Sequence, residues 1–147
     1  MKLLVQRVLE ASVEVDNIVV GQINKGLLVF LGVEKGDDIS KAQHLAKKLV
    51  NLRIFEDENE KMNLNLATVG GDLLVISQFT LYADLRSRRP GFSHAAKPDL
   101  AVALYEKFMS CCRELGFHVE HGEFGADMQV ASVNDGPVTL LFDTDTL

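Results

Sequence analysis

The sequence predicts an α+β fold, in which a mainly antiparallel, barrel-like β-sheet carries two packed helices in one domain over residues 1–147. Two observations support this class. Apolar residues alternate with polar ones in several short segments, as in strands with one buried face. Two longer segments instead repeat apolar residues at helical spacing, and glycine or proline separates most of these segments.

Each expected element follows from a change in this periodicity. The first helix starts behind the capping candidates Asp37 and Asp38, near residue 39, and continues to about residue 50. The second starts at Pro98, whose missing donor is not needed in a first turn, and ends at Gly116. Its expected apolar stripe consists of Leu100, Ala103, Leu104, Phe108, Cys111, Cys112 and Leu115.

The remaining segments are expected to be strands and loops. The first strands should form an antiparallel meander, the polar segment 56–72 should hold only a short hairpin, and residues 83–97 should form a loop. The expected strands are 3–15 (one long bent strand or a strand pair), 18–20, 26–33, 73–82, 117–121, 128–133 and 138–142.

Composition and charge exclude several classes of protein. Apolar residues make up 47% and charged residues 24%, which indicates a globular chain, and the apolar runs are too short to span a bilayer. Met1-Lys2 leads directly into strand-like alternation without a signal-peptide pattern, which favours a cytoplasmic location. The adjacent Cys111 and Cys112 are expected to stay reduced.

One segment departs from the acidic balance of the chain. The net charge of −6 argues against a general nucleic-acid binder. Within residues 84–97, however, Arg86, Arg88, Arg89 and Lys97 are accompanied by Asp84 as the only acidic residue, so that four positive charges and one negative charge give +3. A localised contact with an anion and an ordinary solvated loop both fit this pattern.

The expected strand 73–82 is apolar until it reaches a group of polar side chains. A period of two places Ser77 on one face and Gln78 and Thr80 on the other. Hydroxyl and amide groups at a strand end, with free backbone N–H groups, can hold a carbonyl or an oxyanion. The alternative is a strand end that simply emerges into solvent.

Thr80 is the obvious nucleophile of this group, but the sequence offers no partner that would activate it. A hydroxyl nucleophile needs a base within hydrogen-bond reach. The histidines occupy no recognisable triad motif, and each is expected to be a surface or partly buried residue. They are His44, His94, His118 and His121.

The segment Asn134-Asp135-Gly136-Pro137-Val138-Thr139 combines turn residues with a proline at the start of a strand. Glycine adopts positive φ without penalty, and Asn and Asp side chains bond nearby backbone. A bond preceding proline is also cis in roughly 5% of cases in folded proteins. Taken alone, the segment favours an ordinary hairpin turn.

These two segments together resemble the signature motifs of the D-aminoacyl-tRNA deacylases. The first motif is Ser77-Gln78-Phe79-Thr80-Leu81, and the second is the segment 134–139, at family-like separation. The similarity covers essentially the whole chain. It extends to Gln6-Arg7-Val8, to Gly26-Leu27-Leu28-Val29 before a helix, and to Gly125-Ala126-Asp127-Met128-Gln129-Val130.

The resemblance implies the deacylase fold and a cytoplasmic ester hydrolase that needs no cofactor and no metal. This enzyme would release D-amino acids from tRNA, and glycine mischarged on tRNA(Ala). It would be a homodimer with active sites at the subunit interface, where a cis Gly136–Pro137 bond reaches into the partner's pocket. The carbonyls of this gate would exclude L side chains, whereas glycine has no side chain to exclude.

The resemblance also implies roles for individual residues. Ser77, Gln78, Phe79 and Thr80 would form the catalytic pocket, in which the ribose 2′-hydroxyl of the substrate and water act and Thr80 forms no covalent bond. Arg7 would brace the gate across the interface through carbonyl hydrogen bonds. Phe124 and Met128 are candidate adenosine contacts or ordinary core residues, and Arg86, Arg88 and Arg89 are candidate phosphate contacts.

Two rival functions stay open from the sequence. One is a module that binds nucleic-acid ends without chemistry. The other is a hydrolase of small metabolite esters that depends on Thr80 as its nucleophile.

Overall fold

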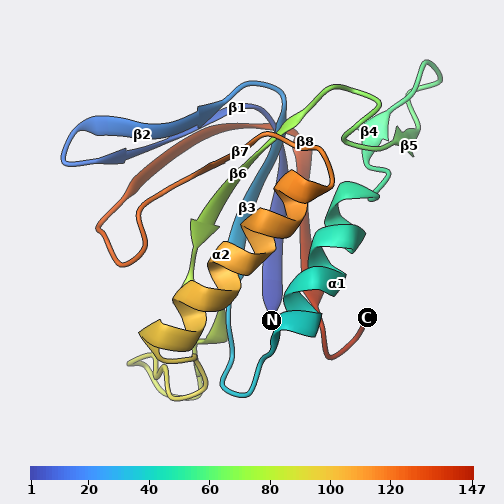
Figure 1. The fold of residues 1–147 in the computed structure, drawn as a ribbon. Helices are drawn as coiled ribbons and strands as arrows, with labels where there is room; N and C mark the ends of the chain where they lie inside the picture. The colour runs from blue at the N-terminus through green and yellow to red at the C-terminus, as the bar shows by residue number, and fades with distance from the viewer.

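The computed structural model covers residues 1–147 and contains two helices packed on one face of a sheet (Figure 1). Its elements, in chain order, are β1 (Lys2–Val15), β2 (Ile18–Ile23), β3 (Gly26–Gly32), α1 (Ile39–Val50), β4 (Phe55–Glu56), β5 (Met62–Leu64), β6 (Asp72–Ser77), the 3-10 helix η1 (Phe79–Tyr82), α2 (Pro98–Glu114), β7 (Val119–His121) and β8 (Gln129–Asp143). The α+β class with two helices is confirmed.

The main sheet has the order β2-β1-β3-β6-β7, with β8 beside β1. Antiparallel pairs join β1 to β2, β3 and β8, and parallel pairs join β3 to β6 and β6 to β7. The expected meander is wrong, because β2 and β3 both pair with β1 and not with each other. The length of β1 explains this, since residues 11–15 pair with β2 and residues 2–8 with β3.

The helices begin where the sequence places them. The Asp38 carboxylate caps α1 by accepting a hydrogen bond of 3.2 Å from the Lys41 backbone N–H. The expected stripe of α2 is wrong at Ala103 and Leu115, which are exposed. Neither helix combines the length and apolarity that a membrane crossing needs. The buried residues of α2 are Ala101, Leu104, Tyr105, Phe108, Met109, Cys111 and Cys112, and both cysteines are free.

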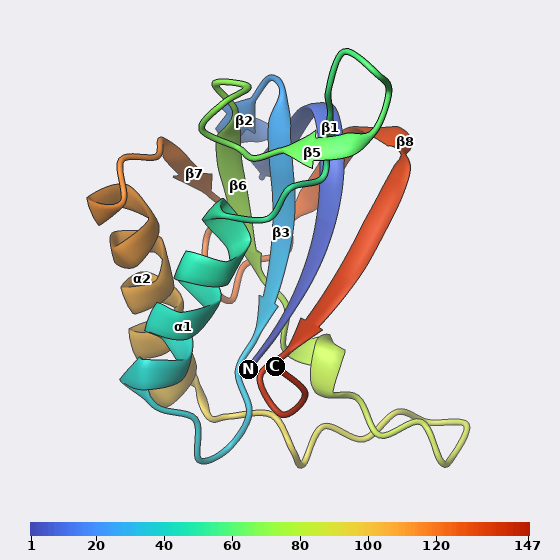
Figure 2. The same ribbon diagram turned by 90° about the vertical axis from the view of Figure 1, so that its right-hand side faces the viewer.

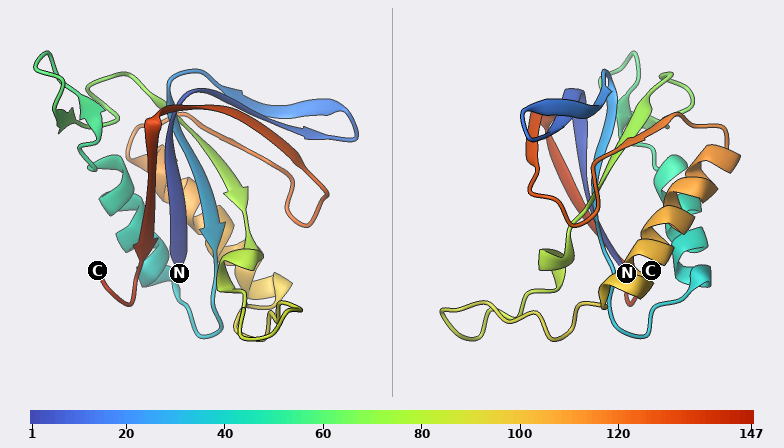
Figure 3. Two further views of the ribbon diagram at one scale, coloured as in Figure 1. Left: turned by 180° about the vertical axis from the view of Figure 1, so that it is seen from behind. Right: turned by 60° about the vertical axis from the view of Figure 1, so that its left-hand side comes forward.

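Alternate residues of β3 and β6 face two separate apolar cores. One core lies between the sheet and the helices and includes Leu27 and Leu73. The other lies on the opposite face and includes Leu28 and Leu74, as expected from a period of two. Figure 2 shows the helices on one side of β3 and β6. Figure 3 shows β1 and β8 bending together, which gives the sheet its barrel-like curvature.

The expected strand 73–82 is wrong beyond Ser77. The Gln78 N–H still bonds the Leu31 carbonyl of β3 at 2.8 Å, but the Leu81 N–H turns back to the Gln78 carbonyl at 3.2 Å. The chain therefore enters η1, and the two-faced arrangement expected for residues 77–82 does not form.

The expected hairpin at residues 134–139 is also wrong. Residues 129–133 and 138–142 of the two expected strands belong to one strand, β8, because β1 offers a continuous partner along nearly its whole length. The residues of β8 between these two parts are accommodated by shifts in its pairing register with β1, between Gln6 and Val8 and between Val8 and Glu10. Such bulges bend a strand. The expected side-chain bond is present, since Asn134 Oδ1 accepts from the Val138 N–H at 2.9 Å.

The close contact of β3 with the start of β6 gives a stability prediction. A Cβ on Gly26 would lie 2.0 Å from the Asp72 backbone oxygen. We expect Gly26→Ala to lower the free energy of unfolding by about 2 kcal/mol or more, because the backbone of a paired strand must move. Urea denaturation measures the change. In the control Gly91→Ala the nearest atom lies at 3.8 Å, and a shift within about 0.5 kcal/mol is expected; equal stability of the two variants would contradict the prediction.

Candidate active site

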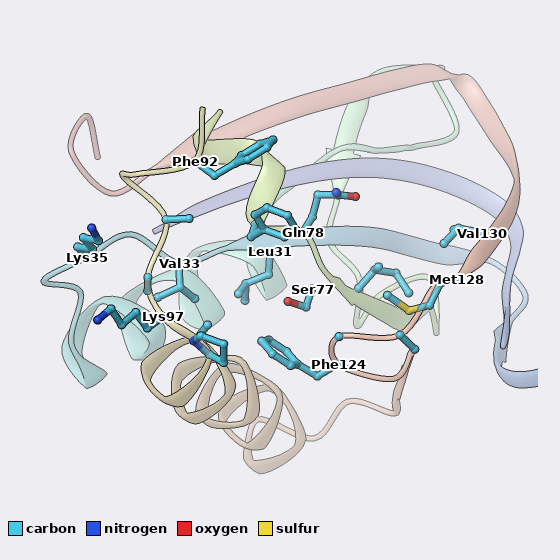
Figure 4. A pocket seen from close by; sticks show the side chains of 18 residues that line it. Leu31, Val33, Lys35, Ser77, Gln78, Phe92, Lys97, Phe124, Met128 and Val130 are labelled. Atoms are coloured by element: carbon cyan, nitrogen blue, oxygen red, sulfur yellow. The ribbon is translucent and has the colours of Figure 1, made fainter. Parts of the chain in front are cut away.

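A cavity of about 680 Å³ lies where the parallel strands β3, β6 and β7 end. The carboxyl ends of parallel strands meet at one edge of a sheet, and ligands commonly bind there. The segment after β3 supplies one wall, the segment after β6 the centre, and the segment after β7 the opposite wall, while the start of α2 closes the base. Figure 4 shows the residues: Leu31, Val33, Lys35, Ile76, Ser77, Gln78, Phe79, Phe92, Ala95, Ala96, Lys97, Pro98, Ala101, Phe124, Gly125, Ala126, Met128 and Val130.

The close packing of η1 against β3 positions Gln78 and Phe79 at the cavity. A Cβ on Gly32 would lie 3.0 Å from Leu81 Cβ and 3.2 Å from the Gln78 carbonyl oxygen. The absence of a side chain on Gly32 therefore lets η1 pack closely against the end of β3. Ser77 and Gln78 are half-buried, whereas Phe79 is more exposed.

Aromatic side chains form two walls of the cavity. Phe79 meets Phe92 edge to face, with ring centroids 5.0 Å apart. Phe124 lies on the other side, tilted against Tyr105 at 6.0 Å. Burial raises the pKa of Tyr105 to about 12, and its neutral hydroxyl donates a 3.1 Å hydrogen bond to the Val75 carbonyl. Phe124 thus has a fixed support while one side of it faces the cavity.

Met128 and Phe124 lie in the same cavity as Ser77 and Gln78, as Figure 4 shows. Both are only partly buried, although each also packs against a core cluster. Their packing against the cores and their place in the cavity lining are both observed, and contact with adenosine stays a prediction. An aromatic face and a thioether on one wall suit a planar base.

The cavity lining contains no carboxylate, imidazole or thiol group. The lining has two hydroxyl or amide side chains, Ser77 and Gln78, and two lysines, but no Asp, Glu, His or Cys. None of the four histidines lines it. His118 instead pairs with Glu120 at 3.0 Å, and His121 Nδ1 lies 2.6 Å from the Gly122 carbonyl oxygen.

Thr80 is exposed and stands beside the cavity, outside its lining. Its hydroxyl oxygen accepts a hydrogen bond from the Gln78 side-chain amide. An amide donor cannot remove a proton from a hydroxyl. The local geometry thus orients Gln78 and Thr80 relative to each other without activating Thr80 as a nucleophile.

Gly136 and Pro137 are exposed on β8, and neither lines the cavity of its own chain. The bond between them is cis, as the family resemblance implied. Gly136 has φ of +132°, a conformation that favours glycine.

Arg7 supports this segment from within the same chain. It is 3% exposed, its Nε donates a 3.0 Å hydrogen bond to the Asp135 carbonyl, and its Nη1 donates one of 2.7 Å to the Ile54 carbonyl. Glu56 and Asp135 carboxylates lie 3.7 and 3.5 Å from the guanidinium. A buried guanidinium with carbonyl and carboxylate partners holds the backbone just before Gly136.

In the basic loop, residues 84–97, one of the three arginines is already paired within the chain. Arg86 is held by Asp84, with Nη2 and Oδ2 2.7 Å apart, and the hydrogen bond from Arg86 lowers the pKa of the Asp84 carboxyl. Arg88 and Arg89 are exposed and form no ion pair, and none of the three arginines lines the cavity.

The cavity thus brings together Ser77, Gln78, Phe79, Phe124 and Met128 of the predicted site. Thr80, Arg7, Gly136 and Pro137 lie outside it. Sequence reasoning missed Lys35 and Phe92 altogether, and Lys97 was noticed only for its charge. These residues belong to loops whose place in the fold no periodicity predicts.

Comparison with known proteins gives consistent matches over nearly the whole chain. The family model described as D-Tyr-tRNA(Tyr) deacylase matches residues 4–143. A D-aminoacyl-tRNA deacylase from Thermosipho africanus (strain TCF52B) is 55% identical over 145 residues, covering 98% of this chain and 97% of the relative. One from Shewanella baltica (strain OS185) is 61% identical over 137 residues, covering 92% and 94%.

Solved structures agree with these sequence matches. A structure described as c-Myc DNA Unwinding Element Binding Protein is 36% identical, with a TM-score of 0.92 and coverage of 98% of this chain and 99% of the other. A probable eukaryotic D-amino acid tRNA deacylase is 18% identical, with a TM-score of 0.82 and coverage of 96% and 97%, and shares the fold. The family model and the full-length relatives show that this chain belongs to the D-Tyr-tRNA(Tyr) deacylase family.

Proposed function

We propose that this chain hydrolyses the ester between a D-amino acid and the terminal ribose of tRNA, releasing free tRNA and the amino acid. Its family consists of hydrolases that act on ester bonds, and the cavity at the ends of β3, β6 and β7 is the site we assign to the reaction. The reaction would take place in the cytoplasm, as a quality-control step of translation.

The observation that carries this proposal is a cavity with aromatic and polar walls suited to a nucleoside ester, but without a carboxylate, imidazole or thiol base. Phe124 and Met128 would hold the terminal adenine, and Ser77, Gln78 and Phe79 would surround the ester. The first N–H groups of a helix lack acceptors within it, so the N–H groups of Phe79 and Thr80 are our candidate oxyanion donors.

An aminoacyl ester needs little activation, so positioning can suffice. In the proposed step a water oxygen bonds to the carbonyl carbon and the bond to the ribose oxygen breaks. The water proton ends on that ribose oxygen, and the neighbouring 2′-hydroxyl of the substrate assists this transfer. The protein contributes orientation and oxyanion stabilisation.

We also propose that two copies of the chain form a homodimer in which Gly136 and Pro137 of one copy enter the cavity of the other. Three features support this arrangement. Both residues are exposed and lie outside the cavity of their own chain. The strand that carries them, β8, pairs only with β1 and so has a free edge. Large apolar side chains nearby on β1 and β8 are exposed, including Leu9, Val133 and Leu141.

In this dimer the backbone at Gly136–Pro137 would select the configuration of the substrate. An L side chain would collide with this backbone, whereas a D side chain would point away from it. Glycine lacks a side chain, so glycine mischarged on tRNA(Ala) would also be hydrolysed. Arg7 would fix the gate by its hydrogen bond to the Asp135 carbonyl, from its own chain.

The first test compares D-tyrosyl-tRNA, L-tyrosyl-tRNA and glycyl-tRNA as substrates, with and without a chelator. We expect release of D-tyrosine and glycine at rates at least about 100-fold above that of L-tyrosine, equivalent to about 3 kcal/mol. Hydrolysis is followed as loss of labelled amino acid from acid-precipitable tRNA. Equal rates for D- and L-tyrosine would contradict the gate, and tRNA binding without hydrolysis would favour a binding module.

The second test is Thr80→Ala. Because Thr80 has no base beside it, we expect single-turnover hydrolysis of D-tyrosyl-tRNA within about tenfold of the wild-type rate, whereas loss of a nucleophile lowers kcat by several orders of magnitude. Complete loss of hydrolysis with unchanged tRNA affinity would instead support the Thr80-dependent hydrolase.

The third test is Gly136→Ala. The new Cβ would lie 2.8 Å from Val138 Cγ2 and 3.2 Å from Arg7 Nη2, at a φ of +132° that disfavours L side chains. We expect kcat/KM on D-tyrosyl-tRNA to fall about 100-fold, because a misplaced group near the reacting centre is costly.

Gly91→Ala serves as the matched control for this variant, since its Cβ meets nothing closer than 3.8 Å. Circular dichroism and size-exclusion chromatography establish that both variants fold and have the wild-type oligomeric state. A folded Gly136→Ala protein with wild-type kcat/KM and D/L preference would refute the role of this segment.

A further inference from the structure

Two lysines that the proposed reaction does not use line one end of the cavity. In Figure 4, Lys35 and Lys97 lie together at the end opposite Met128 and Val130, with Ser77 between. They come from segments far apart in the sequence, the loop after β3 and the residue before α2.

Backbone hydrogen bonds fasten these two segments to each other. The Lys35 N–H donates to the His94 carbonyl at 3.1 Å, and the Ala96 N–H donates to the Val33 carbonyl at 2.9 Å. An isolated bridge between Glu34 and Ala95 lies between these bonds. The positions from which both side chains extend are therefore fixed, although the side chains are exposed.

The charges of these lysines are not neutralised within the chain. Neither forms an ion pair, in contrast to Lys41, whose Nζ lies 3.0 Å from Asp37, and to Arg86, which is held by Asp84. They are also the only charged residues of the cavity lining. In a chain of net charge −6, this end of the cavity is therefore a local concentration of positive charge.

We propose that Lys35 and Lys97 bind the phosphate on the 5′ side of the terminal adenosine, an inference that rests on the proposed function. With the adenine beside Phe124 and Met128 and the ester beside Gln78, the lysine end is where the RNA backbone leaves the cavity. Ammonium groups bind phosphate as point charges. They would fix the direction of the RNA and offset its repulsion by the acidic chain.

The test isolates this single phosphate with a pair of non-hydrolysable probes. The probes are 3′-deoxy-3′-(D-tyrosylamino)adenosine and the same compound with a 5′-phosphate. Isothermal titration calorimetry at low salt gives the affinity of each for wild type and for the double variant Lys35→Gln/Lys97→Gln. The control is Lys47→Gln/Lys48→Gln, which removes two exposed lysines of α1 that do not line the cavity.

We expect the 5′-phosphate to tighten binding about tenfold in the wild type and in the control, as a charge-assisted contact does. In Lys35→Gln/Lys97→Gln this gain should vanish, while the affinity for the probe without phosphate stays the same. On D-tyrosyl-tRNA, the salt dependence of kcat/KM should become shallower by about one unit in the double variant, because one phosphate contact is lost.

The outcomes separate this inference from the proposed function. If the enzyme hydrolyses D-tyrosyl-tRNA and the two probes bind equally well, or the phosphate gain persists in Lys35→Gln/Lys97→Gln, the phosphate site is wrong and the proposed function stands. If neither probe binds and D-tyrosyl-tRNA is not hydrolysed, both are overturned.

Discussion

The pairing of β1 with three partners is the constraint on which the rest of the structure depends. One half of β1 pairs with β3 and the other half pairs with β2, while β8 pairs with β1 along nearly its whole length. Because β1 fixes β3, and β6 and β7 join in parallel, three strand ends meet at one edge of the sheet. The same strand carries Arg7, which holds the backbone of β8 just before Gly136. One strand thus positions both the cavity and the segment proposed to enter the cavity of a second copy.

The chemistry of the cavity follows from what surrounds it. Apolar and aromatic walls are combined with one hydroxyl, one side-chain amide, two lysines and the start of a helix, but with no carboxylate or imidazole. Such a site can orient an activated ester and stabilise an oxyanion, without a carboxylate or imidazole to act as a base. This composition suits a substrate that brings its own hydroxyl group. The Gln78 side-chain amide donates a hydrogen bond to Thr80, and an amide is not a base that could activate this hydroxyl.

The charges of this mostly apolar cavity are both positive and come from its two lysines. The chain is acidic, and Arg86 of the basic loop already forms an ion pair with Asp84. Positive charge without an ion-pair partner in the cavity lining comes from Lys35 and Lys97, whose backbones are fixed by hydrogen bonds between the loop after β3 and the segment before α2. For a protein that acts on one kind of polyanion, a few positive charges at fixed positions are more useful than a broad basic surface. A broad basic surface would bind any nucleic acid without selectivity.

The sequence by itself determined the class of fold, both helix starts and the two motifs, because periodicity, caps and turn residues act over a few neighbouring positions. It predicted Ser77, Gln78, Phe79, Phe124 and Met128, which do share one cavity. Tertiary structure decided that β6 stops at Ser77, because Gly32 lets η1 pack against β3 at this point. It also decided that β8 continues through Gly136–Pro137 without a hairpin, because β1 offers β8 a continuous partner. It also decided that Lys35 joins Lys97, since their approach depends on hydrogen bonds between segments about sixty residues apart, which no local pattern encodes.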